Sequence, residues 1–247
     1  MKNDIKKYFA ENISDYLKQE KERKELARNS LLTEALKDYM APMRGRTELN
    51  ILEVGGASGV LLKDLVDLGA TPVVAWNLEI VEEYRNYLVD KRIRFINASI
   101  FGNSLTTGYF DFVICRYGLH HFVGDTVSKT IESQKEALRE MARLVKPGGI
   151  LVIEEELMER DYASFCLYFL SRLFARFGLQ LKRFGINRGV MVFFHTKKGI
   201  FGLLDKQNIK YSIIEEIYPK VRAGFVNRAL FLFQKSYPGI FIFRIDK

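Results

Sequence analysis

The feature that most constrains this chain is an apolar run that ends in a glycine-rich turn and continues as an amphipathic helix, ILEVGGASGVLLKDL at residues 51–65. Asn50–Val54 is apolar almost throughout, as expected of a strand buried on both faces. Gly55 and Gly56 end the run, and Val60–Leu68 then has apolar residues at helical spacing. Glycines in such a turn let a ligand approach the backbone closely. The segment therefore predicts an α/β fold with a ligand site at this turn.

The alternation of strand and helix continues to about residue 157. Because each predicted strand is a nearly continuous apolar run, we expect a parallel sheet with helices on both faces. Lys146–Gly149 ends the last helix of this region. The further strands are expected at Thr71–Trp76, Arg92–Ile96, Phe110–Cys115 and Ile150–Glu155, and the helices between them at Glu79–Asp90 and Thr126–Leu144.

Segments of a different character flank this core. Residues 4–40 have apolar positions at helical spacing and predict two helices. After the core we expect one or two helices in Asp161–Phe184, a loop at Gly185–Gly189, an extended segment at Val190–His195 and a helix from Thr196 to Leu204. Two antiparallel strands are expected at Lys210–Tyr218 and Arg228–Gln234, with Gly239–Ile245 as an edge strand or packed on the core.

These segments predict one α/β domain over residues 1–247, with a doubly wound, seven-stranded, mostly parallel sheet and an antiparallel C-terminal strand. Apolar residues make up 48% of the chain, which is enough for a sizeable core. The expected parts are an N-terminal helical cap (1–48), a ligand-binding core (49–157), a lid-like insert after strand five (158–195), and a C-terminal helix with a strand hairpin (196–247).

The net charge of +8 is concentrated in the last third of the chain, where residues 157–247 hold 16 basic and 6 acidic residues. No acidic residue occurs between Tyr162 and Leu204. Such a region can attract an anionic membrane surface, a nucleic acid or an acidic substrate.

Cysteine spacing and hydropathy exclude several classes of protein. Cys115 and Cys166 have no metal-ligand spacing, so we expect reduced thiols, no disulfide and no metal site. The N-terminus is charged throughout, unlike a signal peptide, and no apolar run reaches the ~20 residues of a membrane span. We expect a cytoplasmic protein, with a peripheral position at a membrane as the second option.

Small or polar residues follow each predicted strand. Asn77 follows the second strand, Asn97-Ala98-Ser99 the third, and Cys115–Phe122 the fourth. Because the carboxyl ends of parallel strands meet at one edge of the sheet, these residues should surround the same ligand. A polar side chain after the second strand can bind the ribose hydroxyls of an adenosine, and the group after the third strand can border its adenine.

Three segments together resemble the class I S-adenosylmethionine-dependent methyltransferases, in the branch of small-molecule and quinone-type C- and O-methyltransferases. They are ILEVGGASG (51–59), YFDFVICRYGLHHF (109–122) and REMARLVKPGGILVIEE (139–155), in the order and spacing of that family. The resemblance implies a Rossmann-like fold, S-adenosylmethionine as cofactor and S-adenosylhomocysteine as product.

The resemblance also implies roles for individual residues. Glu53 would orient the turn near the amino group of the cofactor's methionine part, Leu78 would pack on the adenosine, and Arg116 would pass close to the sulfonium. The implied cofactor-binding residues are Glu53, Gly55, Gly56, Ala57, Gly59, Asn77, Leu78, Asn97, Ala98, Ser99, Cys115 and Arg116.

Three positions depart from the family pattern. Ala57 replaces the middle glycine, which the turn should tolerate only if this residue keeps a negative φ. Asn77 replaces the ribose-binding acid, and Glu79 can substitute for it. Asn97 replaces an acid near the adenine amine, at a loss on the order of 1 kcal/mol of charge-assisted hydrogen bonding.

His120 and His121 are the candidate catalytic residues because they follow the fourth strand, near the methyl donor. A histidine with a pKa near 6.5 can take a proton from a hydroxyl acceptor. The alternative is a structural role, in which the pair packs its loop onto the sheet. His195 is expected in a loop or cap, and the candidates for the acceptor pocket are Tyr8, Tyr16 and Tyr117.

The insert allows two interpretations. Its apolar face can simply bury in the core while its arginines are solvated. Alternatively, region 162–198 contacts a membrane surface or receives a hydrophobic acceptor. A nucleic-acid surface is less favoured, since no RNA-binding appendage is present.

The sequence thus predicts methyl transfer from S-adenosylmethionine to a small, apolar or amphipathic acceptor, on oxygen or carbon. Two alternatives stay open: a non-catalytic S-adenosylmethionine-binding scaffold and an RNA methyltransferase. The Gly55–Gly59 turn does not have the GxGxxG pattern of nicotinamide dehydrogenases. The identity of the acceptor and the oligomeric state are not determined by these patterns.

Overall fold

The computed structural model describes residues 5–18, 28–41, 47–68, 72–177, 179, 190–207, 209–218 and 236–246. These residues contain a seven-stranded sheet in the order β3-β2-β1-β4-β5-β7-β6. The first five strands pair in parallel, and β7 is antiparallel to both β5 and β6, which confirms the predicted sheet. The strands are β1 (Leu49–Val54), β2 (Val73–Glu79), β3 (Arg94–Asn97), β4 (Phe110–Arg116), β5 (Val145–Met158), β6 (Tyr211–Ile217) and β7 (Ser236–Ile245).

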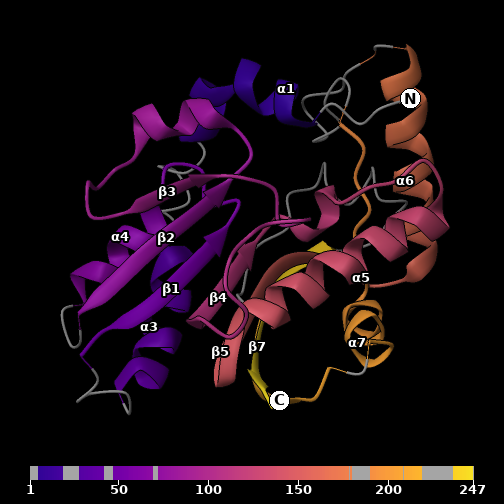
Figure 1. The fold of residues 1–247 in the computed structure, drawn as a ribbon. Coiled ribbons are helices and arrows are strands. Elements are labelled where there is room, and N and C mark those ends of the chain that lie inside the picture. Colours follow the sequence, from indigo (N-terminus) through magenta and orange to yellow (C-terminus); the bar gives the residue numbers. More distant parts are fainter. Residues whose placement is uncertain are drawn as a thin grey trace.

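Helices cover both faces of the sheet (Figure 1). Leu36 of α3 (Arg28–Met40) and Leu65 of α4 (Val60–Asp67) pack on one face, in a core that includes Ile51 and Phe112. On the other face α5 (Val127–Leu144) and α7 (Lys197–Asp205) bury Met141 and Leu204. Further helices are α1 (Ile5–Glu11), α6 (Asp161–Phe177), and the short 3-10 helices η2 (Glu82–Tyr87) and η3 (Leu119–His121).

Strand β2 is longer than predicted. It extends through Glu79, which pairs with Asn97 of β3, so the α-helix expected at Glu79–Asp90 is wrong. The Glu79 side chain accepts a hydrogen bond from Val81 N at 3.0 Å, and the chain then forms only η2. Asn77, Leu78 and Glu79, which were expected to follow this strand, therefore belong to the sheet itself.

The C-terminal strands also differ from the prediction. Residues Gly239–Ile245 belong to β7, which lies between β5 and β6 and is not an edge strand. Phe241 and Ile242 are both fully buried on opposite faces of the sheet, so the strand needs neighbours and helices on all sides. The strand expected at Arg228–Gln234 and the loop expected at Gly185–Gly189 lie outside the described residues.

A buried glutamine joins three segments next to the end of β4. Gln134 of α5 is fully buried, and its Nε2 donates to the backbone oxygens of Leu119 (3.0 Å) and Phe193 (3.1 Å). Its Oε1 lies 2.6 Å from Nε2 of His195, so His195 must donate through that nitrogen. The contact holds residues 190–195 against η3. It also makes His195 a structural residue, because burial keeps the imidazole neutral and lowers its pKa to about 4.

This buried histidine predicts acid sensitivity. Between pH 6.5 and pH 4 the unfolded chain protonates His195 while the folded chain does not, so stability falls as the pH falls through that window. We expect the wild type to lose about 3 kcal/mol more unfolding free energy than His195→Gln between pH 7 and pH 4. Urea unfolding of both proteins across this range measures the difference. Parallel pH profiles would show that His195 is not the group responsible.

Candidate active site

A cavity of about 610 Å³ lies at the carboxyl ends of β1, β2, β3 and β4, where the strand order reverses. This volume is in the usual range for small-molecule sites, and its position is the one that doubly wound sheets use for ligands. One part of the lining comes from the residues after β1, β2 and β3, namely Gly55–Ala57, Leu78–Ile80 and Ala98–Phe101. A second part comes from Phe9, Tyr16, His120–Val123, Val190, Val192 and Phe194.

The glycine turn after β1 is open toward the cavity and filled toward the sheet. Gly55 has φ +72°, and a Cβ added there would meet nothing within 4 Å. A Cβ on Gly56 would lie 2.7 Å from Glu53 Oε2 and 2.8 Å from Asn77 Oδ1. The two polar side chains thus occupy the space below the turn, and a ligand can approach its backbone from above.

Ala57 adopts φ +45°, so the expectation of a negative φ at this position is wrong. The left-handed conformation costs an alanine on the order of 1 kcal/mol. Two side chains of β2 hold it there, because Ala57 N donates to Glu79 Oε2 (3.2 Å) and Ala57 O accepts from Asn77 Nδ2 (2.8 Å). The turn therefore keeps the shape of a glycine turn although the glycine is missing.

Asn77 and Glu79 have different positions relative to the cavity. Asn77 is fully buried and does not line the cavity, because β2 continues past it and pairs it with Glu53. Glu79 lines the cavity and accepts from the backbone of Ala57 and Val81. Glu79 lies two residues beyond Asn77, where the family has its ribose-binding acid. It is therefore Glu79 that is the polar β2 side chain in the cavity lining.

The other residues predicted to bind the cofactor also divide into those that line the cavity and those that do not. Glu53, Gly55, Gly56, Ala57, Leu78, Ala98, Ser99 and Arg116 line the cavity. Gly59, Asn97 and Cys115 do not. Asn97 Nδ2 donates to Glu79 O at 3.0 Å and so supports the neighbouring strand. Burial raises the pKa of the Cys115 thiol well above its usual value, which keeps it protonated and unreactive.

A buried acid fixes the residues at the end of β4, which also line the cavity. Glu154 of β5 accepts from Arg116 Nε at 2.5 Å and from the Tyr117 hydroxyl at 2.8 Å. Burial opposes the charge of Arg116, but the carboxylates of Glu154 and Glu53 raise its pKa overall. Tyr117 has φ +49°, an uncommon conformation for a bulky residue, and it lines the cavity. Sequence reasoning missed Glu154, whose signal was the acidic end of an apolar strand.

Glu155, the next residue of β5, fixes the position of His120. Glu155 accepts from the backbone N of His120 at 3.0 Å, and its two carboxylate oxygens lie 2.9 and 2.8 Å from His120 Nδ1. Both side chains are buried, and the imidazole stacks on Phe194 with ring centroids 4.3 Å apart. A carboxylate at Nδ1 sets the ring orientation and leaves Nε2 as the basic nitrogen.

The structure places most, but not all, of the remaining predicted residues, His121 and three tyrosines, in the cavity lining. His121 lines the cavity and contacts Phe9 edge to face at 5.3 Å. Tyr16 and Tyr117 line the cavity, whereas Tyr8 packs beside α6 and does not line it. His195 also lies outside the cavity lining, bonded to Gln134.

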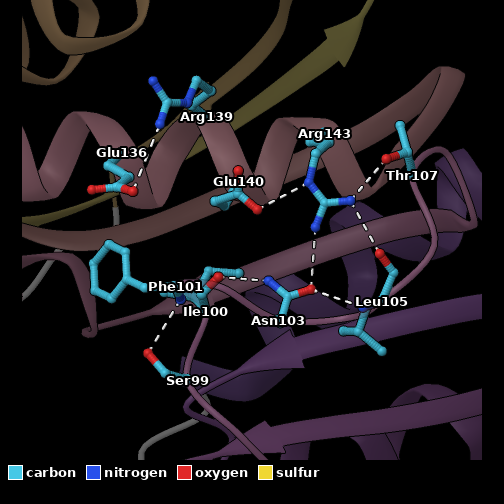
Figure 2. Close-up of polar contacts among 10 residues, drawn as sticks. All are labelled: Ser99, Ile100, Phe101, Asn103, Leu105, Thr107, Glu136, Arg139, Glu140 and Arg143. Carbon is cyan, nitrogen blue, oxygen red and sulfur yellow. Dashed lines mark hydrogen bonds and ion pairs between the residues drawn. The ribbon is translucent and has the colours of Figure 1, made fainter.

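Arg143 of α5 holds the loop that borders the cavity after β3 (Figure 2). Its guanidinium donates to Leu105 O (3.0 Å), Thr107 Oγ1 (2.8 Å) and Asn103 Oδ1 (3.2 Å). Asn103 Nδ2 in turn donates to Ile100 O at 2.6 Å, next to the cavity-lining residues Ser99 and Phe101. A residue far from the glycine turn in sequence thus positions the wall expected to border the adenine.

Comparison with known proteins agrees with this geometry. Residues 52–153 match the model of a methyltransferase domain. The ubiquinone/menaquinone biosynthesis C-methyltransferase UbiE of Coxiella burnetii is 29% identical over 128 residues, which cover 48% of this chain and 48% of UbiE. The chain therefore aligns with about half the length of these curated relatives.

Two solved structures share the fold at low sequence identity. An S-adenosylmethionine-dependent methyltransferase from Methanosarcina mazei is 16% identical, with a TM-score of 0.58 over 84% of this chain and 96% of the other. The YcgJ protein from Bacillus subtilis is also 16% identical, with a TM-score of 0.56 over 85% and 97%. Residues 52–153 thus match a methyltransferase domain, and the strand order around them is the fold of solved S-adenosylmethionine-dependent methyltransferases.

The Arg143 network predicts that α5 controls the part of the cavity lining expected to bind the cofactor. Arg143→Met removes several hydrogen bonds to a charged donor, each worth about 1.5–3 kcal/mol, although partial exposure reduces the total. We expect the unfolding free energy to fall by about 2 kcal/mol and the dissociation constant for S-adenosylhomocysteine to rise several-fold. Calorimetric titration and urea unfolding measure the two effects.

Arg139→Met is the matched control, because Arg139 is on the same helix and, among the described residues, makes an exposed ion pair with Glu136 at 3.7 Å and no contact with the loop after β3 (Figure 2). Equal effects of the two substitutions would show that the loop does not depend on Arg143.

Proposed function

We propose that this chain transfers a methyl group from S-adenosylmethionine to a small, apolar or amphipathic acceptor, on oxygen or carbon. The observation that carries the proposal is a cavity whose lining combines two kinds of residue. The glycine turn and Glu79 offer backbone and polar groups, and aromatic and aliphatic side chains line it together with His120. Such a cavity suits an adenosyl cofactor beside a mostly apolar second molecule.

The residues that line the cavity after β1, β2 and β3 fit the cofactor. The space above Gly55 admits a ligand close to the backbone, and Glu79 offers carboxylate oxygens where ribose hydroxyls would lie. Leu78, Ala98 and Ser99 form the apolar and small-residue wall for the adenosine. When bound, S-adenosylmethionine supplies a methyl group already activated on a sulfonium. The protein's own task is to align the acceptor and exclude water.

The apolar part of the cavity lining fits an acceptor with an apolar body. A ring or aliphatic chain can be buried against Phe9, Val190, Val192 and Phe194. The Coxiella burnetii relatives are named for C-methylation in ubiquinone and menaquinone biosynthesis, which supports a ring-containing acceptor. Contact of region 162–198 with a membrane, and with it a peripheral location, is a separate proposal. Among the described residues, no helix has both the length and the apolar character needed to span a bilayer.

His120 is the residue we propose as general base. A proton lost from the acceptor's hydroxyl would pass to His120 Nε2, and the imidazolium formed would be stabilised by Glu155 at Nδ1. Glu155 acts through His120 and is a positioning residue. His121 is placed by its contact with Phe9, which favours a packing role for the second histidine.

Ligand binding tests the proposed cofactor site directly. We expect S-adenosylmethionine and S-adenosylhomocysteine to raise the melting temperature, since a ligand at 100 times its dissociation constant adds about 2.7 kcal/mol of stability. NAD should have no effect, and Glu53→Gln should reduce the shift because Glu53 supports the turn from below. Absence of any shift at saturating ligand would overturn the proposal. Binding without methyl transfer to any acceptor would identify the scaffold alternative.

The base is tested with the best acceptor from a panel of phenols and hydroxyquinones, by release of S-adenosylhomocysteine. His120→Gln should lower kcat by roughly 100-fold, the usual contribution of a general base, without weakening cofactor binding. Glu155→Gln should lower kcat and move the acidic limb of the pH profile, because the charge beside Nδ1 is lost. His121→Gln is the control and should retain most activity. Similar losses in both histidine variants would indicate a structural pair.

A further inference from the structure

Helix α6 exposes a continuous apolar stripe to the surface. Tyr162, Phe165, Phe169, Leu173 and Phe177 are 45%, 40%, 59%, 51% and 65% exposed. Their spacing of three and four residues places them on one side of the helix, which we call the outer face of α6. Scattered exposed apolar residues are ordinary, but a stripe of this length marks an interaction surface.

The opposite side of α6 is buried against the wall of the cavity. Ala163 and Leu167 pack in one cluster with Val190 and Val192, and Ser171 Oγ accepts from Val192 N at 3.3 Å. Val190 and Val192 both line the cavity, so the buried side of α6 packs against residues of the cavity wall. The helix lies at the edge of the molecule (Figure 1). The helix is apolar on two sides, whereas an ordinary surface helix is apolar on one.

The charges around the outer face indicate what covers it. Arg176 is exposed beside Phe177, and Arg172 donates to the Tyr168 hydroxyl at 3.1 Å. No acidic residue follows Asp161 until Asp205. Anionic lipid headgroups would neutralise these arginines, and the chain offers no carboxylate between Tyr162 and Leu204 to repel the lipid. The aromatic side chains are of the kind that settle at the membrane–water interface.

We propose that the outer face of α6 binds the surface of an anionic lipid bilayer, with the helix lying in the plane of the interface. The helix has 17 residues, shorter than a membrane span, and its basic and aromatic residues match an interfacial helix. Docking would bring the cavity wall next to the lipid, where an apolar acceptor is dissolved. This last step rests on the proposed function, whereas docking itself does not.

The test is co-flotation of the full chain with vesicles of phosphatidylcholine, with and without phosphatidylserine. The wild type should float with the anionic vesicles, and added salt should release it because the arginine contacts are screened. Phe169→Gln/Phe177→Gln should weaken binding by at least about tenfold, and Arg176→Gln should weaken it only on anionic vesicles. Both phenylalanines are exposed, so the double variant should fold.

Ile213→Gln is the matched control, because Ile213 is also an exposed apolar residue (48%) but lies on β6. It should bind vesicles like the wild type, and all variants should keep the melting shift with S-adenosylhomocysteine. The proposal is overturned if the wild type does not float, or if the α6 double variant floats equally well. A wild-type dimer that this double variant converts to monomer, without vesicle binding, would show that a second copy covers the face. Loss of the melting shift in every protein would instead contradict the proposed function.

Discussion

Parallel pairing holds β1 between β2 and β4, and all six residues of β1 are buried. Because the strands run in the same direction, their carboxyl ends meet at one edge, and the chain leaves each strand toward the cavity. The pairing sets Glu53 beside Asn77 and Val54 beside Cys115. Every contact of the glycine turn depends on this register, since a shift by one residue would turn each side chain to the other face.

Buried acids at the strand ends then shape the cavity. Glu154 and Glu155 are neighbours on β5, so their side chains point to opposite faces and hold different partners. Glu154 fixes Arg116 and Tyr117, and Glu155 fixes His120. Carboxylates this deeply buried are stabilised only when such donors surround them. The same short segment of β5 therefore fixes both the charged Arg116 in the cavity lining and the orientation of the proposed base.

The strands and helices of the core could be predicted because the apolar runs are long and the glycines that end them are unambiguous. The strand β1, the turn and α4 follow directly from ILEVGGASGVLLKDL. The end of β2 could not be predicted, because Asn77 and Glu79 are polar and resemble the start of a loop. Their place in the sheet depends on hydrogen bonds to Ala57 and on pairing with β3, which are far apart in sequence.

By itself the sequence determined the class of fold and the position of the glycine turn at the end of β1, because apolar periodicity and glycine positions act locally. Only the tertiary structure decided which polar side chain of β2 faces the cavity, that Ala57 takes a positive φ, and that Glu155 holds His120. It likewise showed that the outer face of α6 is exposed. These outcomes depend on contacts between segments distant along the chain, which no local pattern encodes.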